Sequence, residues 1–251
     1  MIFLIMKKEL KSFFRSPLGY VVTGLFCLVV GWMFMHQLDY FINNVQKVPV
    51  HMRNHYDFTN EVIIKLFSNV NFLLLFITPI LGMRSFSEEY RDRTIELYFS
   101  SPISDFEIII GKYLGLLLQG FFFLSMTFIY PLVLSNLEIT DISFLITGYI
   151  GLFLNFSCYA VISIFASSLS TNQILSALGG FVLILGIWIT GWFGQSSSNY
   201  LLAQILNFVS VNFHFTHLLK GTIHFSDLAF YFSFICFGIL LTKKRLEARF
   251  W

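Results

Sequence analysis

The chain has 251 residues, of which 56% are hydrophobic and only 12% are charged, and its formal net charge at pH 7 is +2. Soluble domains carry about 25% charged residues, so this composition excludes a soluble fold and predicts an all-α membrane protein. Three cysteines, Cys27, Cys158 and Cys236, lie in apolar runs and predict neither a disulfide framework nor a compartment.

The first fifteen residues predict an amphipathic helix rather than a membrane span. Apolar residues share one helical face, and four cations share another: Lys7, Lys8, Lys11 and Arg15. This pattern is typical of a helix that lies in the membrane interface. Pro17 is expected to end this helix before the first span. The alternative is a merely basic tail that helps to set the orientation of the chain.

Six apolar segments predict six membrane spans, because a bilayer core needs about 20 apolar residues per helix. Their bounds are 18–38, 62–83, 113–134, 142–169, 174–193 and 228–242. The outer loop 194–227 is apolar but interrupted, which predicts short helices rather than a further span. We therefore expect residues 1–251 to form a single transmembrane domain.

The Lys and Arg residues predict the orientation of the spans, since they concentrate on the cytoplasmic side of membrane proteins. With a cytoplasmic N-terminus, 12 of these residues fall inside and 4 outside, which accounts for all 16. Both termini and the connection 84–112 are then cytoplasmic. The span cores contain no Asp or Glu, which argues against an ion-coupled transporter, because such proteins bind the coupling ion at membrane depth.

The connection between the second and third spans is unusually polar for this chain. The chain has 16 basic and 14 acidic residues, and ten of these charged residues lie in the connection: Arg84, Glu88, Glu89, Arg91, Asp92, Arg93, Glu96, Asp105, Glu107 and Lys112. Two Ser-x-x-Glu patterns, at Ser85 and Ser104, have the spacing of helix capping boxes, and Glu89 with Arg93 has the spacing of an ion pair on a helix. These patterns predict a helix, a turn and a second helix. Mixed charge suits docking on a polar protein surface, and the alternative is a solvated helix whose charges pair with one another.

A motif within this connection resembles the signature of ABC-2-type transporter permeases. That signature has a charged run, Gly-Thr-hydrophobe-Glu-Leu, a later Pro, and Gly-Lys before the third span. The matching residues here are Thr94, Ile95, Glu96, Leu97, Pro102, Gly111 and Lys112. Arg93 stands where the family usually has Gly. The resemblance covers essentially the whole chain and points to the small permeases of the gliding-motility and NosY-like type.

The resemblance implies that the connection holds a coupling helix, which inserts into a cleft on a separate ATPase subunit beside the interfacial helix. The residues implied in this contact are Glu88, Glu89, Arg91, Asp92, Arg93, Thr94, Ile95, Glu96, Leu97 and Pro102. Reversal of Glu89 or Glu96 is expected to uncouple the ATPase without unfolding the membrane domain. The chain contains no G-x-x-x-x-G-K-[ST] sequence, so ATP and Mg would be bound by the partner subunit and no cofactor by this chain.

The implied assembly contains two ATPase copies and a second permease, identical or homologous, in the bacterial cytoplasmic (inner) membrane. It would couple ATP hydrolysis to export or to force transmission, in some relatives through a periplasmic partner. Three glycines of the fifth span could pack against the second permease or within the chain: Gly179, Gly180 and Gly186. The alternative function is a non-transport scaffold or assembly factor that docks a cytoplasmic partner.

Other polar residues give weaker indications, and no catalytic site is predicted. Four amides in or near the spans could line a substrate path but more simply bond to neighbouring helices: Asn69, Asn71, Asn155 and Gln173. Two histidine pairs have the spacing of metal ligands on a helix: His51 with His55, and His214 with His217. Cysteines and clustered carboxylates do not accompany these pairs in the sequence, so we expect interfacial histidines rather than a metal site.

Overall fold

The computed structural model describes residues 1–47, 59–95, 103–135, 142–196 and 199–248. In these ranges the chain forms helices and no strand, and six helices are long and apolar enough to cross a membrane. This confirms the all-α membrane class with six spans. The long helices are α2 (Pro17–Lys47), α3 (Lys65–Gly82), α6 (Asp105–Thr127), α8 (Ile142–Leu169), α9 (Gln173–Ser196) and α12 (Phe225–Glu247).

Shorter elements complete the bundle. They are α1 (Ile2–Arg15), the π-helical turn η2 (Thr59–Ile64), α4 (Arg84–Arg91), α7 (Ile129–Ser135), α10 (Tyr200–Val209) and α11 (Val211–Leu219). Several helices run past the predicted span ends, as α12 does by continuing to Glu247. A helix that already has its apolar turns packed can continue into polar sequence, because its backbone groups bond within the helix.

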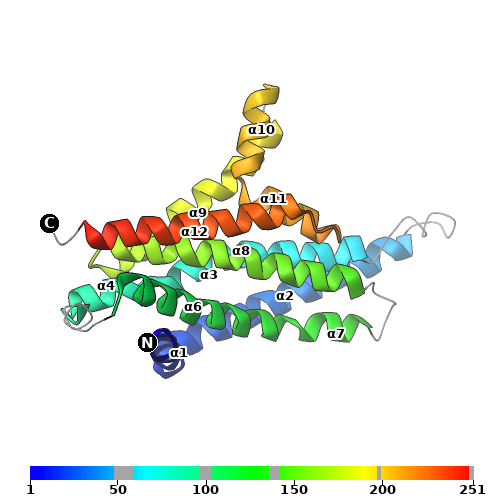
Figure 1. Cartoon of the computed structure of the whole chain (residues 1–251). Helices are drawn as coiled ribbons and strands as arrows, with labels where there is room; N and C mark the ends of the chain where they lie inside the picture. The colour runs from blue at the N-terminus through cyan, green and yellow to red at the C-terminus, as the bar shows by residue number, and fades with distance from the viewer. Residues whose placement is uncertain (48–58, 96–102, 136–141, 197–198, 249–251) are drawn as a thin grey trace.

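Helix α8 is the centre of the bundle. Of the most apolar residues of α8, 78% are buried, against 22% of the corresponding residues of α9 and of α12. Its neighbours α3, α6, α9, α11 and α12 all pack against it (Figure 1). Gly120 of α6 allows the closest approach, because a Cβ atom at this position would overlap the Phe156 ring of α8. The apolar residues of α8 are therefore covered mainly by the other helices of the chain.

Helix α1 lies across one end of the bundle rather than along it. Figure 1 shows α1 almost end-on, while α2, α6, α8 and α12 run across the picture. Ile5 and Phe13 are buried, whereas Phe3 and Leu4 are largely exposed. The helix predicted at the N-terminus is present, and it packs on α6 as well as presenting an exposed apolar side.

The charged connection starts differently from the prediction. The helix does not begin at Ser85, because the backbone at Met83 stays in the right-handed helical region and carries α3 into α4. Ser85 is buried and is not a cap residue, so the first predicted capping box is wrong. The second is confirmed: Ser104 accepts from the Glu107 amide, and the Glu107 carboxylate accepts from the Ser104 amide.

Two short helices occupy the region 194–227. Helix α11 packs into the bundle through buried residues that include Phe215 and Leu218. Helix α10 projects away from the bundle in Figure 1, and none of its residues is buried. Its apolar side chains, such as Leu201 and Ile205, are therefore exposed along with large parts of α2 and α9.

Candidate coupling site

Lys112, at the start of the third span, has a completely buried side chain. Its ammonium group lies 2.9 Å from the carboxylate of Glu9 in α1 and 2.9 Å from the carboxylate of Glu89 in α4. It also donates to the Ser85 carbonyl and lies 5.0 Å from the centre of the Phe86 ring. A buried cation costs several kcal/mol unless it is paired and hydrogen-bonded, and here two carboxylates from two different helices provide that compensation.

A second lysine completes this ion cluster, which consists of Lys8, Glu9, Glu89 and Lys112. The ammonium group of Lys8 lies 2.9 Å from the same Glu89 oxygen, but its side chain is half exposed. Two cations and two anions give the cluster a formal net charge of zero. Because its members come from α1, α4 and α6, the cluster joins three elements that are distant in sequence.

Two glycines of α6 allow α1 to come close enough for these ion pairs. A Cβ atom at Gly111 would lie 2.8 Å from the Cβ of Ile5, and one at Gly115 would lie 2.8 Å from the Cβ of Glu9. Such contacts are too short for real Cβ atoms, so the close packing of α1 on α6 depends on both positions lacking a side chain. The Gly-Lys pair at the start of the span thus has a structural role on this chain.

A serine of α8 fixes the start of α4. The Ser167 hydroxyl accepts hydrogen bonds from the amides of Phe86 and Ser87, at 2.9 and 3.1 Å, and donates to the Met83 carbonyl at 2.9 Å. Amides in the first turn of a helix need such partners when they are buried. The capping that the sequence predicted for Ser85 is therefore provided by Ser167, which lies 80 residues after Ser87 in the chain.

The coupling residues predicted from the sequence fall into two groups. Arg91, the last residue of α4, and the following Asp92, Arg93 and Thr94 are exposed, so they form a charged surface at the end of α4. Glu89 differs from them, because its side chain is buried and pairs with Lys8 and Lys112.

The rest of that set lies at the edge of this surface or beyond the described part of the chain. Glu88 is half-buried, and Ile95 packs against the core. Glu96, Leu97 and Pro102 lie outside the described residues. The surface that is available for a partner therefore consists of the exposed residues from Arg91 to Thr94.

Arg93 has a left-handed backbone, with φ of 56°. It follows Asp92, the last residue of the α4 cap, and its amide bonds back to the Tyr90 carbonyl at 3.3 Å. Glycine adopts this conformation without strain, which gives a physical reason for the glycine that the resemblance leads us to expect at this position. The predicted ion pair between Glu89 and Arg93 is wrong, because Arg93 lies beyond the helix.

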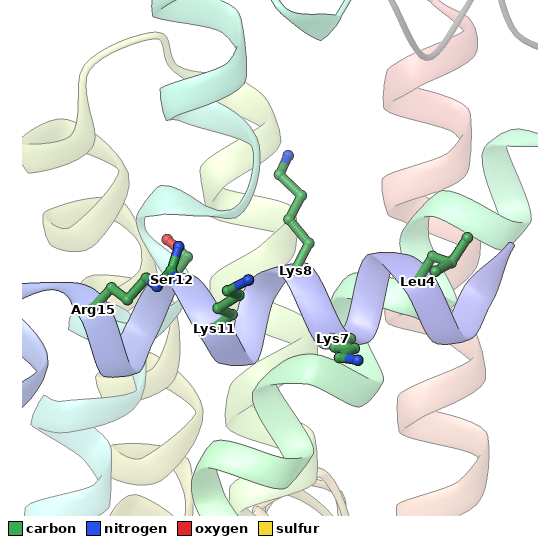
Figure 2. A pocket seen from close by; sticks show the side chains of 6 residues that line it. All are labelled: Leu4, Lys7, Lys8, Lys11, Ser12 and Arg15. Carbon is green, nitrogen blue, oxygen red and sulfur yellow. The ribbon is translucent and has the colours of Figure 1, made fainter.

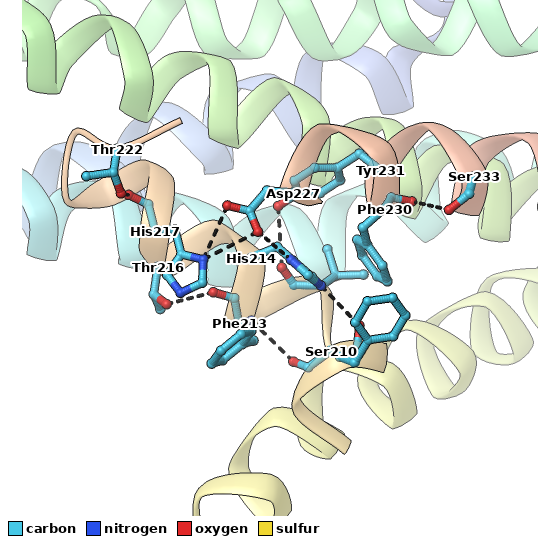
Figure 3. Close-up of polar contacts among 12 residues, drawn as sticks. Ser210, Phe213, His214, Thr216, His217, Thr222, Asp227, Phe230, Tyr231 and Ser233 are labelled. Carbon is cyan, nitrogen blue, oxygen red and sulfur yellow. Dashed lines mark hydrogen bonds and ion pairs between the residues drawn. The ribbon is translucent and has the colours of Figure 1, made fainter. Parts of the chain in front are cut away.

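Histidine and aspartate side chains converge at the opposite end of the bundle (Figure 3). The His214 ring nitrogen Nδ1 lies 2.7 Å from the Asp227 carboxylate, and its Nε2 lies 3.0 Å from the Phe208 carbonyl. His217 Nδ1 lies 3.2 Å from the other Asp227 oxygen. The buried Asp227 therefore joins α11 to the first turn of α12, and His214 joins both to the end of α10.

These histidines do not form a metal site with other residues that the structure describes, since no group of three or more His, Cys, Asp or Glu side chains there could hold a metal ion. The shared partner of His214 and His217 is a single carboxylate that accepts their hydrogen bonds. His51 and His55 lie outside the described residues. The shared contact with Asp227 is a feature that the spacing of His214 and His217 did not predict.

Two of the predicted amides bond to neighbouring helices. Asn155 of α8 donates to Asn71 of α3 at 2.9 Å, and Tyr231 of α12 donates to Asn155 at 2.6 Å. Both amides are buried, so these bonds satisfy polar groups inside the bundle. Asn69 and Gln173 are half-buried, and for them bonding to a neighbouring helix stays a prediction.

The three glycines of α9 do not share one environment. A Cβ atom at Gly180 would meet Pro79 and Ala166 of this chain at 3.4 and 3.5 Å. Cβ atoms at Gly179 and Gly186 would have no described neighbour within 4 Å. Gly180 therefore serves packing within the chain, and the other two belong to an exposed face.

Together, the six apolar helices and the charged element fixed to one end define a helical multi-pass membrane protein. Residues 3–241 match the family described as ABC-2 family transporter protein, so the chain belongs to the ABC-2 transporter family. The match includes α1, the charged connection and parts of all six long helices. A search of curated proteins found no match.

Proposed function

We propose that this chain is the permease subunit of an ATP-driven ABC-2 transporter, and that a separate ATPase subunit binds the exposed surface after α4. The observation that carries the proposal is the ion cluster. Glu89 lies just before the exposed residues and is bonded to Lys8 of α1 and Lys112 of α6. A displacement of this surface by ATP-driven closure of the ATPase would therefore act on α1 and α6 together.

Further contacts extend this path to the rest of the bundle. Helix α4 continues α3 directly, and Ser167 holds its first turn to α8. Arg84 donates to the Ser16 hydroxyl at 2.9 Å, between α1 and α2. The charged element is thus attached to the ends of five helices, which suits the transmission of force better than a freely solvated loop would.

The proposed assembly pairs two ATPase subunits with two permeases, identical or homologous. The ATPase subunits bind the ATP and Mg. The exposed face of α9 with Gly179 and Gly186, together with exposed residues of α2 such as Trp32, offers an apolar surface for the second permease. The exposed helix α10 offers a surface for a periplasmic partner, as in force-transmitting machines of the gliding-motility and NosY-like type.

The proposed location is the bacterial cytoplasmic membrane, with both termini in the cytoplasm. Helices α1 and α4 and the end of α12 lie at the same end of the bundle in Figure 1. This end carries most of the Lys and Arg residues, including Lys7, Lys11 and Lys243. The positive-inside rule therefore assigns it to the cytoplasm.

The test is affinity purification of the tagged chain in mild detergent, with mass spectrometry of the proteins that accompany it. A protein with Walker motifs should co-purify with the wild type. It should be lost from the double variant Arg91→Glu with Arg93→Glu, which reverses one exposed charge at the end of α4 and one just after it.

The matched control is Lys243→Glu with Lys244→Glu, which makes the same charge change at the same end of the bundle and should keep the partner. Loss from both variants would contradict the docking surface. Reproducible absence of an ATPase from intact wild-type protein would instead favour a scaffold that docks another partner.

A further inference from the structure

The exposed side of α1 contains a hollow of about 400 Å³ lined mainly by cations. Its lining residues are Leu4, Lys7, Lys8, Lys11, Ser12 and Arg15, all on one helix (Figure 2). Lys8 pairs with Glu89, but Lys7, Lys11 and Arg15 have no carboxylate within 4.0 Å among the residues that the structure describes. Within the described part of the chain, the hollow therefore presents three positive charges without a paired carboxylate, together with the Ser12 hydroxyl.

An apolar surface adjoins these cations. Phe3 is 68% exposed, and Phe14 lies next to Lys7 and Lys11 around the helix and is 37% exposed. The Phe14 ring packs edge-on against Phe122 of α6, with 5.0 Å between the ring centres. The apolar side of α1 thus continues onto the exposed surface of a helix that is long and apolar enough to cross the membrane.

We propose that this hollow binds the phosphate headgroup of an anionic phospholipid, whose acyl chains lie along Phe14 and the adjoining surface of α6. Lys and Arg side chains donate several hydrogen bonds to phosphate oxygens, and Arg can do so with two parallel bonds. An acidic protein partner would match the cations but would leave the exposed phenylalanines in water. A lipid matches both surfaces at once, and α1 lies across the end of the bundle, where headgroups are found (Figure 1).

Such a lipid would lie beside the ion cluster, because Lys8 belongs to both sites. Its ammonium group bonds to Glu89, and the residue also lines the hollow. The inference does not depend on an ATPase partner, since the binding surface is formed by α1 and α6 alone.

The experiment places the full chain in phosphatidylcholine nanodiscs that contain a minor fraction of phosphatidylglycerol, and counts retained lipids by native mass spectrometry. The wild type should retain phosphatidylglycerol in preference to phosphatidylcholine. In the double variant Lys7→Gln with Lys11→Gln, the affinity of the chain for phosphatidylglycerol should be about thirtyfold lower, because each cation near the membrane surface contributes about 1 kcal/mol. Lys8 is left unchanged because its loss would also disturb the ion cluster.

Two further variants separate the charge from other effects. Lys243→Gln with Lys244→Gln, at the end of α12, removes the same charge and should leave retention within about twofold of the wild type. The double variant Lys7→Arg with Lys11→Arg keeps both charges and should retain phosphatidylglycerol as the wild type does. Equal loss in the α1 and α12 variants, or failure of the arginine variant, would overturn the proposal.

The source of the anion is tested in the same discs. Inorganic phosphate at a concentration matched to the phosphatidylglycerol should not displace the lipid, because free phosphate lacks the acyl chains. Equal displacement would assign the hollow to a soluble anion and would overturn the lipid proposal. A second result would also overturn the lipid proposal. In it, an ATPase requires Lys7 and Lys11 for binding in discs without anionic lipid, and the wild type shows no preference for phosphatidylglycerol.

Discussion

The ammonium group of Lys112 lies 2.9 Å from the carboxylate of Glu89, which places the charged element after the second span in direct contact with the start of the third. Glu9 of α1 approaches the same ammonium group at the same distance. The element that is expected to meet an ATPase is therefore part of the packed interior on one side and exposed on the other.

Replacement of Glu89 by lysine should destabilise the membrane domain. The variant would place a third cation against Lys8 and Lys112 in a site with little access to water, and breaking a buried ion pair costs about 3–5 kcal/mol. Glu88→Lys changes the neighbouring, half-buried residue and should cost about 1 kcal/mol or less. Thermal unfolding of both variants in detergent measures the difference, and equal stability would contradict the internal role of Glu89. The predicted destabilisation by Glu89→Lys replaces the expectation from the sequence that reversal of Glu89 leaves the fold intact.

Replacement of Glu89 by glutamine should separate docking from transmission. The variant keeps the exposed residues after α4 but weakens the bonds to Lys8 and Lys112. A hydrogen bond to a charged group is worth about 1.5–3 kcal/mol, so stimulation of partner ATP hydrolysis by the permease should fall by about tenfold to about a hundredfold while the partner still co-purifies. Glu88→Gln should behave like the wild type. If Glu89→Gln loses the partner or keeps full stimulation, the cluster does not transmit movement.

Replacement of Arg93 by glycine should stabilise the chain. Arg93 adopts a left-handed backbone, which costs a residue with a side chain about 1 kcal/mol relative to glycine. Arg91→Gly is the matched control, because Arg91 lies within α4, where glycine should cost about 0.5–1 kcal/mol. The two variants should shift the unfolding temperature in opposite directions. A loss of stability in both would show that the side chain of Arg93 outweighs its backbone strain.

Replacement of Gly186 by leucine should weaken the pairing of permeases without harming the monomer. The position has no described neighbour within 4 Å, whereas Gly180 meets Pro79 and Ala166. Gly180→Leu should therefore overpack the bundle and cost about 1–3 kcal/mol. Cross-linking between copies in native membranes measures pairing, and unfolding measures the monomer. Unchanged cross-linking in Gly186→Leu would remove this face from the proposed interface.

Local patterns predicted much of the fold. The six apolar segments, the N-terminal helix and the Ser104–Glu107 capping box depend on residues close in sequence, and all are present. The bond from Ser167 to α4 and the pair of Lys112 with Glu9 join residues 80 or more positions apart, so no periodicity could indicate them.

One signal for the ion cluster was available in the sequence. Glu9 is the single acid among the charges of α1, and it lies on the side of the helix that carries Ile5 rather than on the basic side. An acid at such a position predicts a buried cation as its partner. The identity of that cation depends on the packing of α1 across α6, which the sequence pattern does not contain.

The bond between Ser167 and the start of α4 also determines which helices can move relative to one another when α4 is displaced. Helix α8 is the most buried of the long helices and touches most of the others, so a push that reaches it cannot be absorbed by bending one peripheral helix. The central helices would move as one rigid body. The sliding surface would then lie at α2, which packs mainly on α3, η2 and α1, whereas α9 and α12 pack directly on α8. A disulfide that locks α2 to α6 should stop the cycle, whereas one between α8 and α3 should leave it running.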